Sequence, residues 1–323
     1  MRDSAFERLF GCAAIAATIV ASITVAACGG GFQTGGGISG TSVVFGQIGG
    51  FGSIIVNGIE FDTTNAVITL EGDPATENDL RLGMVVSVRG IVDPGGLTGT
   101  AEIVAMEDLL EGPVEGVNVG DGTFMAFSQL VITDAETVFD GTTLATLVAG
   151  EDVEVSGFYD ADGSVRATRV ERKLVGVEIE IKGTVSSLDL VAETFRFGLL
   201  TIDYSGALLE GLPPGGIVDG LFVEVEAAAP AAADLLTASG VETLDQILMA
   251  DIGDAAAVEG FITAIVSADE FVVNATQQVI ITPDTRFEGG DLGDVVLNAR
   301  VEVDGTIDQD GAIIASEIEF LAP

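Results

Sequence analysis

Two pairs of aspartates have the residue types and spacing of a calcium loop. They lie in Asp160-Ala161-Asp162-Gly163 and Asp308-Gln309-Asp310-Gly311, and Ca²⁺ is a hard cation that binds several oxygen ligands. In an EF-hand loop the glycine stands sixth, whereas here it stands fourth and a strand is expected directly after it. Because Asp-Gly also provides the positive φ angle of a tight turn, we favour hairpin turns and keep these four aspartates as weak metal candidates.

The composition offers little support for catalytic chemistry. The chain has no histidine and no tryptophan, which excludes Ser-His-Asp and Cys-His catalytic units, imidazole metal sites and tryptophan stacking platforms. Two carboxylates facing a cleft are enough for glycoside hydrolysis, but sugar sites usually have aromatic walls, and the tyrosines are only Tyr159 and Tyr204. We therefore expect a protein that is not an enzyme and has no catalytic residue and no cofactor.

The chemistry predicted at the N-terminus is lipid attachment at Cys28. The preceding run, Leu9–Ala27, is uncharged, rich in alanine and ends in Ala-Ala directly before Cys28. It resembles a bacterial lipoprotein signal peptide, in which the cysteine thiolate accepts diacylglycerol. The resemblance implies that residues 1–27 are removed and that Cys28 becomes the first residue of the mature chain. The alternative is a transmembrane anchor, for which the run is long enough, but its composition favours the cleaved signal.

The segment after the signal peptide, residues 28–41, is expected to be a tether. It is rich in glycine, as in GGGFQTGGGISG over residues 29–40, which predicts a flexible chain. Gly29 rather than aspartate follows the cysteine, and by resemblance to enterobacterial sorting this implies an outer-membrane lipoprotein of the bacterial cell envelope, facing the periplasm or the cell surface. Cys28 is the only cysteine left after processing, so no intrachain disulfide is expected.

The charge balance limits the partners. Acidic residues number 51 against 12 basic ones, for a formal charge of -39, while 48% of residues are hydrophobic. Nucleic acid is excluded because phosphate binding relies on Lys and Arg; the expected partners are the membrane through the lipid at Cys28, and envelope proteins or cations. The one basic cluster can dock an acidic partner or a neighbouring copy, although we favour a solvated strand with protective charges. This cluster consists of Arg166, Arg169, Arg172 and Lys173.

Three landmarks repeat four times along the chain. Each copy has an opening glycine, then a large apolar residue followed by an acid and a glycine, then two valines that flank one polar residue. The opening glycines are Gly46, Gly112, Gly183 and Gly260, the second glycines are Gly72, Gly141, Gly211 and Gly289, and the polar residues between the valines are Ser87, Glu154, Glu224 and Glu302. Nearly constant separations in four copies indicate internal repeats.

Each copy is predicted to contain five short strands. Asn57-Gly58 between apolar residues indicates a hairpin, because both turn positions need positive φ. The alternation around the paired valines predicts that the valines face a core and the polar residues face water. Gly90, Gly157 and Gly305 follow the valines and suit a bulge that lets a short sheet curl, whereas the third copy has Ala227 at this position.

Each copy is predicted to have the layout of the OB barrel. Three strands are followed by a connector of about nine residues, which can hold one helical turn, and then by two further strands. We therefore expect an all-β fold of four tandem small OB-like five-stranded barrels, with a five-stranded sandwich or open sheet as the alternative. Barrels are favoured because closure removes edge strands that would otherwise pair between copies. The expected boundaries are signal peptide 1–27, tether 28–41, repeats 42–107, 108–173 and 174–241, a connector 242–255 with a short amphipathic helix over Glu242–Ala250, and repeat 256–323.

The first copy resembles the bacterial domain of unknown function 5666. The resemblance is carried by Gly50-Phe51-Gly52-Ser53-Ile54-Ile55-Val56-Asn57-Gly58 and by Leu82-Gly83-Met84-Val85-Val86-Ser87-Val88-Arg89-Gly90; it is clear in copies two and four and weak in copy three. The family occurs in tandem in envelope lipoproteins, which implies location and architecture and no functional residues.

The function expected from these features is that of a non-enzymatic, lipid-anchored cell-envelope protein whose tandem acidic β-barrel domains act as a structural or protein-binding adaptor. The alternative is binding of a small ligand, Ca²⁺ or a polysaccharide by the OB-like repeats. The adaptor is favoured because the sequence shows no set of aromatic or polar residues shared by one face of every copy, and the ligand-binding residues are unknown.

Overall fold

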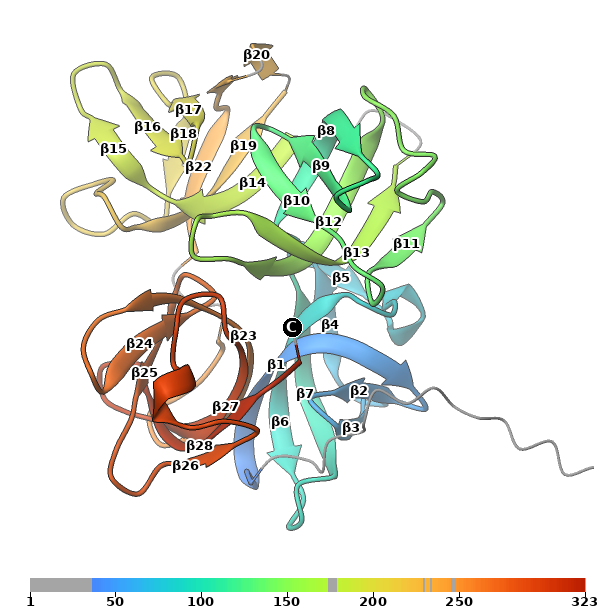
Figure 1. The fold of residues 1–323 in the computed structure, drawn as a ribbon, viewed down its shortest axis with the longest axis vertical. Coiled ribbons are helices and arrows are strands. Elements are labelled where there is room, and N and C mark those ends of the chain that lie inside the picture. The colour runs from blue at the N-terminus through green and yellow to red at the C-terminus, as the bar shows by residue number, and fades with distance from the viewer. Residues whose placement is uncertain (1–36, 174–178, 229, 233, 245–247, 323) are drawn as a thin grey trace, which may run out of the picture. The chain divides into compact units, whose positions relative to one another are not determined.

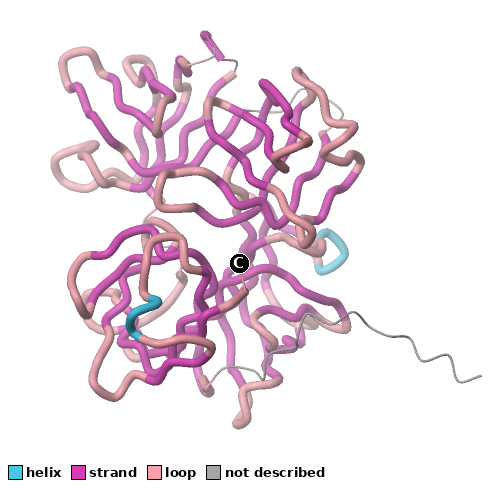
Figure 2. Tube along the Cα trace, in the orientation of Figure 1, coloured by secondary structure: helices cyan, strands magenta, loops and turns pink. Residues whose placement is uncertain are grey.

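Strands make up most of the described part of the chain, which in this computed structural model comprises residues 37–173, 179–228, 230–232, 234–244 and 248–322 (Figures 1 and 2). The predicted signal peptide and Cys28 lie outside the described residues. Strand β1 begins at Gly40, inside the segment expected to be a tether. No helix among the described residues is long and apolar enough to cross a membrane.

The two N-terminal copies contain the five predicted strands and additional short ones. Copy 1 contains β1 (Gly40–Phe51), β2 (Ile54–Val56), β3 (Ile59–Asp62), β4 (Val67–Leu70), β5 (Asp73–Ala75), the 3-10 helix η1 (Glu77–Asp79), β6 (Val85–Val92) and β7 (Thr98–Met106). Copy 2 contains β8 (Leu110–Asn118), β9 (Thr123–Ala126), β10 (Gln129–Ile132), β11 (Val138–Asp140), β12 (Asp152–Tyr159) and β13 (Val165–Arg172). The additional strands are β4 and β5 in copy 1 and β11 in copy 2.

Copies 3 and 4 repeat this order, and copy 3 has additional breaks. Copy 3 contains β14 (Ile179–Thr184), β15 (Ser186–Asp189), β16 (Thr194–Phe197), β17 (Leu200–Asp203), β18 (Leu208–Glu210), β19 (Phe222–Ala227), β20 (Pro230–Ala232), β21 (Leu235–Thr237) and β22 (Gly240–Thr243). Copy 4 contains β23 (Ala255–Ile265), β24 (Glu270–Val273), β25 (Gln277–Ile280), β26 (Arg286–Glu288), the 3-10 helix η2 (Leu292–Asp294), β27 (Arg300–Ile307) and β28 (Ile313–Phe320). Among the described residues, the helical turn predicted in the connector is present in copy 1 as η1 and in copy 4 as η2, whereas residues 142–149 of copy 2 are not helical.

Strand pairing closes on itself within three of the copies. In copy 1, β1 pairs with β2, β2 with β3, β3 with β7, β7 with β6 and β6 with β1, and only β3–β7 in this ring is parallel. Copy 2 repeats the ring with β8, β9, β10, β13 and β12, and copy 4 repeats it with β23, β24, β25, β28 and β27. Barrel-like sheets with buried valine, isoleucine and phenylalanine cores result.

The predicted turn and bulges are confirmed. Asn57 and Gly58 both have positive φ, 49° and 70°, and the pairing register shifts at Gly90, Gly157 and Gly305. A Cβ atom at these three glycines would lie 2.1–2.3 Å from a carbonyl oxygen of the next strand, so the bulge admits only glycine.

Copy 3 has alanine at the bulge position, and its strands are interrupted. Ala227 carries a Cβ atom, so its backbone cannot lie as close to a carbonyl oxygen of the next strand as the three bulge glycines do. The last strand is divided into β21 and β22 and the first into β14 and β15, so the ring order is shared between two sheets.

Strands do pair between copies, so the expectation that closure would prevent this is wrong. In β1, residues 40–47 pair with β6 but pairing with β2 begins only at Ile48, which leaves one edge of the first half of the strand open. The Ser42–Phe45 segment uses that edge to pair in parallel with Ala255–Val258 of β23, and β8 pairs with β14 in the same region of copies 2 and 3.

Two further expectations are wrong. The polar residues between the paired valines do not all face water: Ser87, Glu154 and Glu302 are buried, because other segments of the chain cover the outer face of these strands. The short helix expected over Glu242–Ala250 is not seen in the described part of that segment, since Glu242 and Thr243 extend β22 and residues 248–250 are not helical. Strand pairing with β19 outweighs the weak helical pattern.

Candidate functional site

One buried lysine is surrounded by carboxylates, and we call this group the acid–lysine cluster. Lys182 on β14 is 3% exposed. Its Nζ atom lies 3.0 Å from Oε2 of Glu71, 3.3 Å from Oε2 of Glu224, 3.5 Å from Oε2 of Glu107 and 3.8 Å from Oδ1 of Asp108, and it also forms an ion pair with Glu180. Five carboxylates thus share one buried ammonium group.

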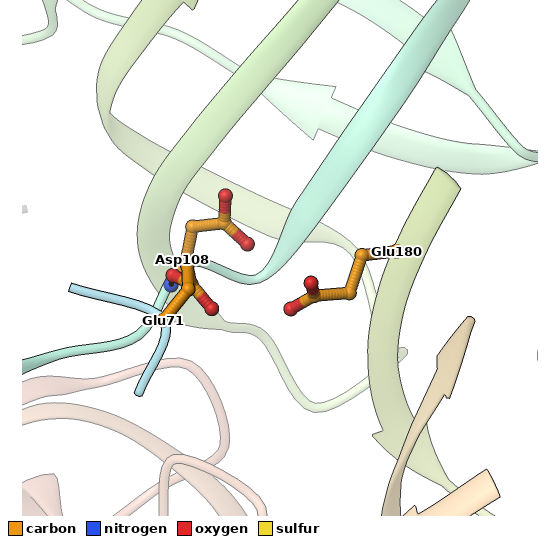
Figure 3. A group of neighbouring side chains, drawn as sticks. All are labelled: Glu71, Asp108 and Glu180. Carbon is orange, nitrogen blue, oxygen red and sulfur yellow. Dashed lines mark hydrogen bonds between the residues drawn. The ribbon is translucent and has the colours of Figure 1, made fainter. Parts of the chain in front are cut away.

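The cluster is assembled from copies 1 and 3 and the linker between copies 1 and 2. Glu71 follows β4 with a φ of 46°, and Glu107 and Asp108 lie between β7 and β8. Glu180 and Lys182 are two residues apart on β14, so their side chains point to the same face of the sheet. On that face, Glu224 of β19 is directly opposite Lys182. Figure 3 shows the carboxylates of Glu71, Asp108 and Glu180 turned towards a common space.

Main-chain contacts hold β14 in this position. The Lys182 N–H donates to the carbonyl oxygen of Leu109 at 3.0 Å, and the hydroxyl of Tyr159 donates to the Lys182 carbonyl oxygen at 2.5 Å. The linker and β12 therefore fix the backbone from which the ammonium group extends.

The electrostatics follow from burial of many like charges. Burial by itself lowers the pKa of Lys182, but the carboxylates of Asp108 and Glu71 outweigh it and hold that pKa well above its usual value. Burial, followed by repulsion from Glu71, raises the pKa of Asp108 well above its usual range. Burial also raises the pKa of Glu71, Glu180 and Glu224.

Asp108 is the least satisfied member of the cluster. It is 1% exposed, and neither of its carboxylate oxygens accepts a hydrogen bond. It also belongs to a second group of three carboxylates, with Glu111 and Glu154, whose oxygens lie within 4.8 Å of one another. Burial raises the pKa of Glu111 to about 7, against a smaller opposing effect of Lys173.

The same cross-strand row of polar residues recurs in three copies. The register places Glu111, Glu154 and Glu171 side by side in copy 2; Lys182, Glu224 and Glu242 in copy 3; and Glu259, Glu302 and Glu319 in copy 4. In copy 1 the row is Phe45, Ser87 and Ala105. A charged row is therefore common to copies 2 to 4 but not to copy 1, so no such set is shared by every copy. The signal was available in the residue before each opening glycine and in the residue between the paired valines.

Each acidic row includes or contacts a cation. Like charges directly opposite one another on neighbouring strands destabilise a sheet. Lys173 forms an ion pair with Glu154 in copy 2, Lys182 is itself part of the row in copy 3, and Arg300 Nη2 lies 2.7 Å from Oε1 of Glu259 in copy 4.

An apolar cavity of about 270 Å³ adjoins the acid–lysine cluster. Phe45, Val85, Phe158, Phe222 and Met249 line its apolar part, while Lys182 and Asp108 line its polar part. The cluster thus has a space beside it that is mostly hydrophobic.

A shallow groove of about 80 Å³ runs along copy 3, and we call it the acidic groove. Glu210, Glu224, Glu226 and Glu242 line it together with the exposed side chain of Leu208, and its lining contains no basic residue. In the register of copy 4, the position of Leu208 is taken by Arg286, which forms an ion pair with Glu317. Glu224 pairs with Lys182 at 3.3 Å, while Glu210 and Glu242 are exposed on the strand edge beside Leu208.

The four aspartates predicted as weak metal candidates lie in hairpin turns, at the β12–β13 and β27–β28 connections. Asp160 Oδ2 lies 2.9 Å from Arg166 Nε, and Asp162 Oδ1 accepts hydrogen bonds from the main-chain N–H and hydroxyl of Ser164. Asp308 Oδ1 accepts from the N–H groups of Asp310 and Ala312. Within the described ranges, neither group of closely spaced carboxylates includes any of them.

The basic cluster is engaged inside the molecule, contrary to the favoured interpretation as a solvated strand. Arg169 is buried and pairs with Asp140 and Glu171, and its Nη1 donates to the carbonyl oxygen of Leu82 in copy 1. Arg166, Arg172 and Lys173 also have carboxylate partners. Arg169 thus contacts copy 1, and the guanidinium of Arg166 lies 5.0 Å from the ring centroid of Phe261 in copy 4, as in the alternative interpretation of contact with a neighbouring copy. Arg172 and Lys173 pair within copy 2.

Comparison with known families matches the repeats to a single model. The model described as "Domain of unknown function (DUF5666)" matches residues 44–104, 111–171 and 259–319, more than half of the chain. The chain belongs to the DUF5666 family. The three DUF5666 segments are copies 1, 2 and 4, as the resemblance predicted, and copy 3 lies between the second and third of them.

Other comparisons add little to the DUF5666 match. No curated protein matches the chain. A solved structure described as "drosophila Unr CSD456" is similar at 17% identity, with a TM-score of 0.18, and the similarity covers 66% of this chain and 97% of that one.

Proposed function

We propose that the chain is a non-enzymatic, lipid-anchored adaptor of the bacterial cell envelope, built from four OB-like barrels. The ring order of pairing in copies 1, 2 and 4, with its one parallel pair, supports an OB-like topology. The same order, divided by strand breaks, supports it in copy 3. Buried valine, isoleucine and phenylalanine side chains occupy the described barrel cores, so the proposal places binding on the outer surface of the repeats.

The single observation that carries the adaptor proposal is the acidic groove. The exposed Glu210 and Glu242, which line the groove beside the exposed side chain of Leu208, are complementary to a basic segment of a partner protein that also offers an apolar side chain. The high net negative charge of the chain would speed the approach of such a partner.

The adaptor proposal predicts that Glu210→Gln/Glu242→Gln weakens partner binding. Two exposed ion pairs of about 0.7 kcal/mol each correspond to about tenfold in affinity. The measurement is chemical crosslinking in intact cells followed by mass spectrometry of the crosslinked peptides. We expect basic protein segments to crosslink to copy 3 of the wild type, and the yield to fall in the double variant.

The matched control is Glu288→Gln/Glu319→Gln, which removes the same charge at the corresponding strand positions of copy 4. It is expected to keep the crosslinks. An equal loss in the control would show that only overall charge matters. Recovery of no protein neighbour, together with glycan binding on an array, would favour the alternative of polysaccharide binding.

The proposed lipid anchor predicts that the wild-type chain is labelled by radioactive fatty acid and that Cys28→Ser abolishes the labelling. Without the thiol, no diacylglycerol is attached and the lipoprotein signal peptidase has no substrate, so the Cys28→Ser chain should keep residues 1–27 as a larger precursor. Inhibition of the lipoprotein signal peptidase in the wild type should leave a precursor of the same length. A wild-type chain that stays in the membrane without fatty-acid label, and whose size does not change with the inhibitor, would instead indicate a transmembrane anchor.

A further inference from the structure

Asp108 lies where two groups of carboxylates meet, and the two groups differ in how they are neutralised. The first group is Glu71, Asp108 and Glu180, and the second is Asp108, Glu111 and Glu154. The Lys182 ammonium pairs with all three members of the first group. A cation is therefore already present at the first group, as part of the protein.

The carboxylates of the second group have fewer positive charges and hydrogen-bond donors near them. Lys173 pairs with Glu154, but no described residue forms a hydrogen bond or an ion pair with the Glu111 carboxylate. Asp108 is 1% exposed and neither oxygen accepts a hydrogen bond; the nearest positive charge is Lys182 Nζ, 3.8 Å from Oδ1. A buried carboxylate without hydrogen-bond donors is costly unless it takes up a proton or a ligand satisfies it.

We propose that Asp108, Glu111 and Glu154 bind one divalent cation, with Ca²⁺ as the preferred ion. All three carboxylates belong to copy 2 and the linker directly before it, so one rigid unit holds them: Glu111 of β8 is opposite Glu154 of β12, and Asp108 precedes β8 by two residues.

Three neighbouring carboxylates suit Ca²⁺, which takes about six to eight oxygen ligands in flexible geometry. One oxygen of each carboxylate lies within 4.8 Å of the other two. Mg²⁺ requires ligands at about 2.1 Å in strict octahedral geometry. Three carboxylates supply up to six oxygens, and water completes the coordination.

Copy 4 provides an internal comparison. Its row has Glu259 and Glu302 at the positions of Glu111 and Glu154, but Ala256 stands where copy 2 has Asp108. Arg300 pairs with Glu259 there. The third carboxylate is thus particular to copy 2, and the proposed site is absent from copy 4. This inference is independent of the proposed adaptor function and of the acidic groove.

The test is calcium binding to the full chain purified in detergent and treated with a chelator. Calorimetric titration with CaCl₂ is expected to show one saturable high-affinity site per chain. Asp108→Asn should abolish this binding, and Glu111→Gln should weaken it by about tenfold or more, because affinity depends on the number of ligand charges. Glu302→Gln, the equivalent of a Glu154 substitution in copy 4, should leave it unchanged.

Several results would overturn the site. These are absence of saturable binding by the wild type, unchanged binding in Asp108→Asn or Glu111→Gln, or an equal loss in the Glu302→Gln control. Circular dichroism of each variant verifies folding. If Asp108→Asn does not fold, Glu111→Gln tests the same site alone, because the half-buried Glu111 has no bonded partner among the described residues to lose.

Discussion

Replacement of Lys182 by methionine is expected to reduce the free energy of unfolding by about 3–5 kcal/mol near pH 7, the usual cost of removing one partner of a buried ion pair. Methionine keeps the length of the side chain and removes its charge. Five carboxylates then remain around an apolar group, with Asp108 and Glu180 left without their common cation. The measurement is urea denaturation followed by circular dichroism.

The loss in Lys182→Met should depend on pH. Burial raises the pKa of Asp108, Glu71, Glu180 and Glu224 in the folded protein, so the folded state holds protons that the unfolded chain releases. Stability from such groups is complete below their unfolded pKa values and is lost as pH rises. Without the ammonium group these pKa values rise further, and the carboxyl groups are protonated at higher pH. The loss of unfolding free energy in Lys182→Met should therefore become smaller as the pH falls towards about 5.

Lys173→Met is the control for Lys182→Met. Its side chain is 27% exposed and pairs with Glu154, and exposed ion pairs contribute about 0–1 kcal/mol. Equal losses in the two variants would mean that charge removal, rather than the buried cluster, determines the effect.

Local features of the fold were predictable because their causes are local. Asn57-Gly58 specifies a turn through backbone geometry alone, and the bulge at Gly157 follows from a glycine two residues after a valine pair. The requirement for glycine at the opening position also has a local cause, which is contact with a nearby side chain. At Gly112, for example, a Cβ atom would lie 2.2 Å from Cζ of Phe127. These residues repeat at fixed spacing, so a sequence alignment of the copies reveals them.

The acid–lysine cluster was not predictable because its members come from different copies. Glu71 and Lys182 are 111 positions apart, and Lys182 replaces a glutamate or phenylalanine of the other copies. Asp108 has no counterpart in the repeat and reads as an ordinary linker residue. Only the pairing of β8 with β14 brings these side chains together, and that pairing depends on an open strand edge that the sequence pattern does not reveal.

Glu302→Gln is expected to stabilise the protein, and increasingly so as the pH rises. Burial, with repulsion from Asp304, Glu259, Glu317 and Glu319, raises the pKa of Glu302 to about 9. The folded state therefore keeps this carboxyl protonated near neutral pH while the unfolded chain ionises. Its contribution to stability is complete below about pH 4.5 and is lost progressively up to about pH 9.

The size of this effect follows from the linkage relation. Each pH unit within that window costs about 1.4 kcal/mol, so glutamine should raise the free energy of unfolding by about 5 kcal/mol near pH 8 and by less than about 1 kcal/mol near pH 5. Arg300 and Arg286 face the same region but pair with Glu259 and Glu317, so neither neutralises Glu302. Urea denaturation at both pH values measures the difference.

The control for Glu302→Gln is Glu288→Gln, which removes one negative charge from an exposed position on β26 of the same copy. Because that carboxylate is in water in both the folded and unfolded states, its loss should change stability little at either pH. A gain in Glu302→Gln that is the same near pH 5 and pH 8 would show that repulsion between fixed charges, rather than a proton held by the folded state, is the source. A gain that grows with pH only in Glu302→Gln would show that strand pairing in copy 4 keeps this glutamate protonated.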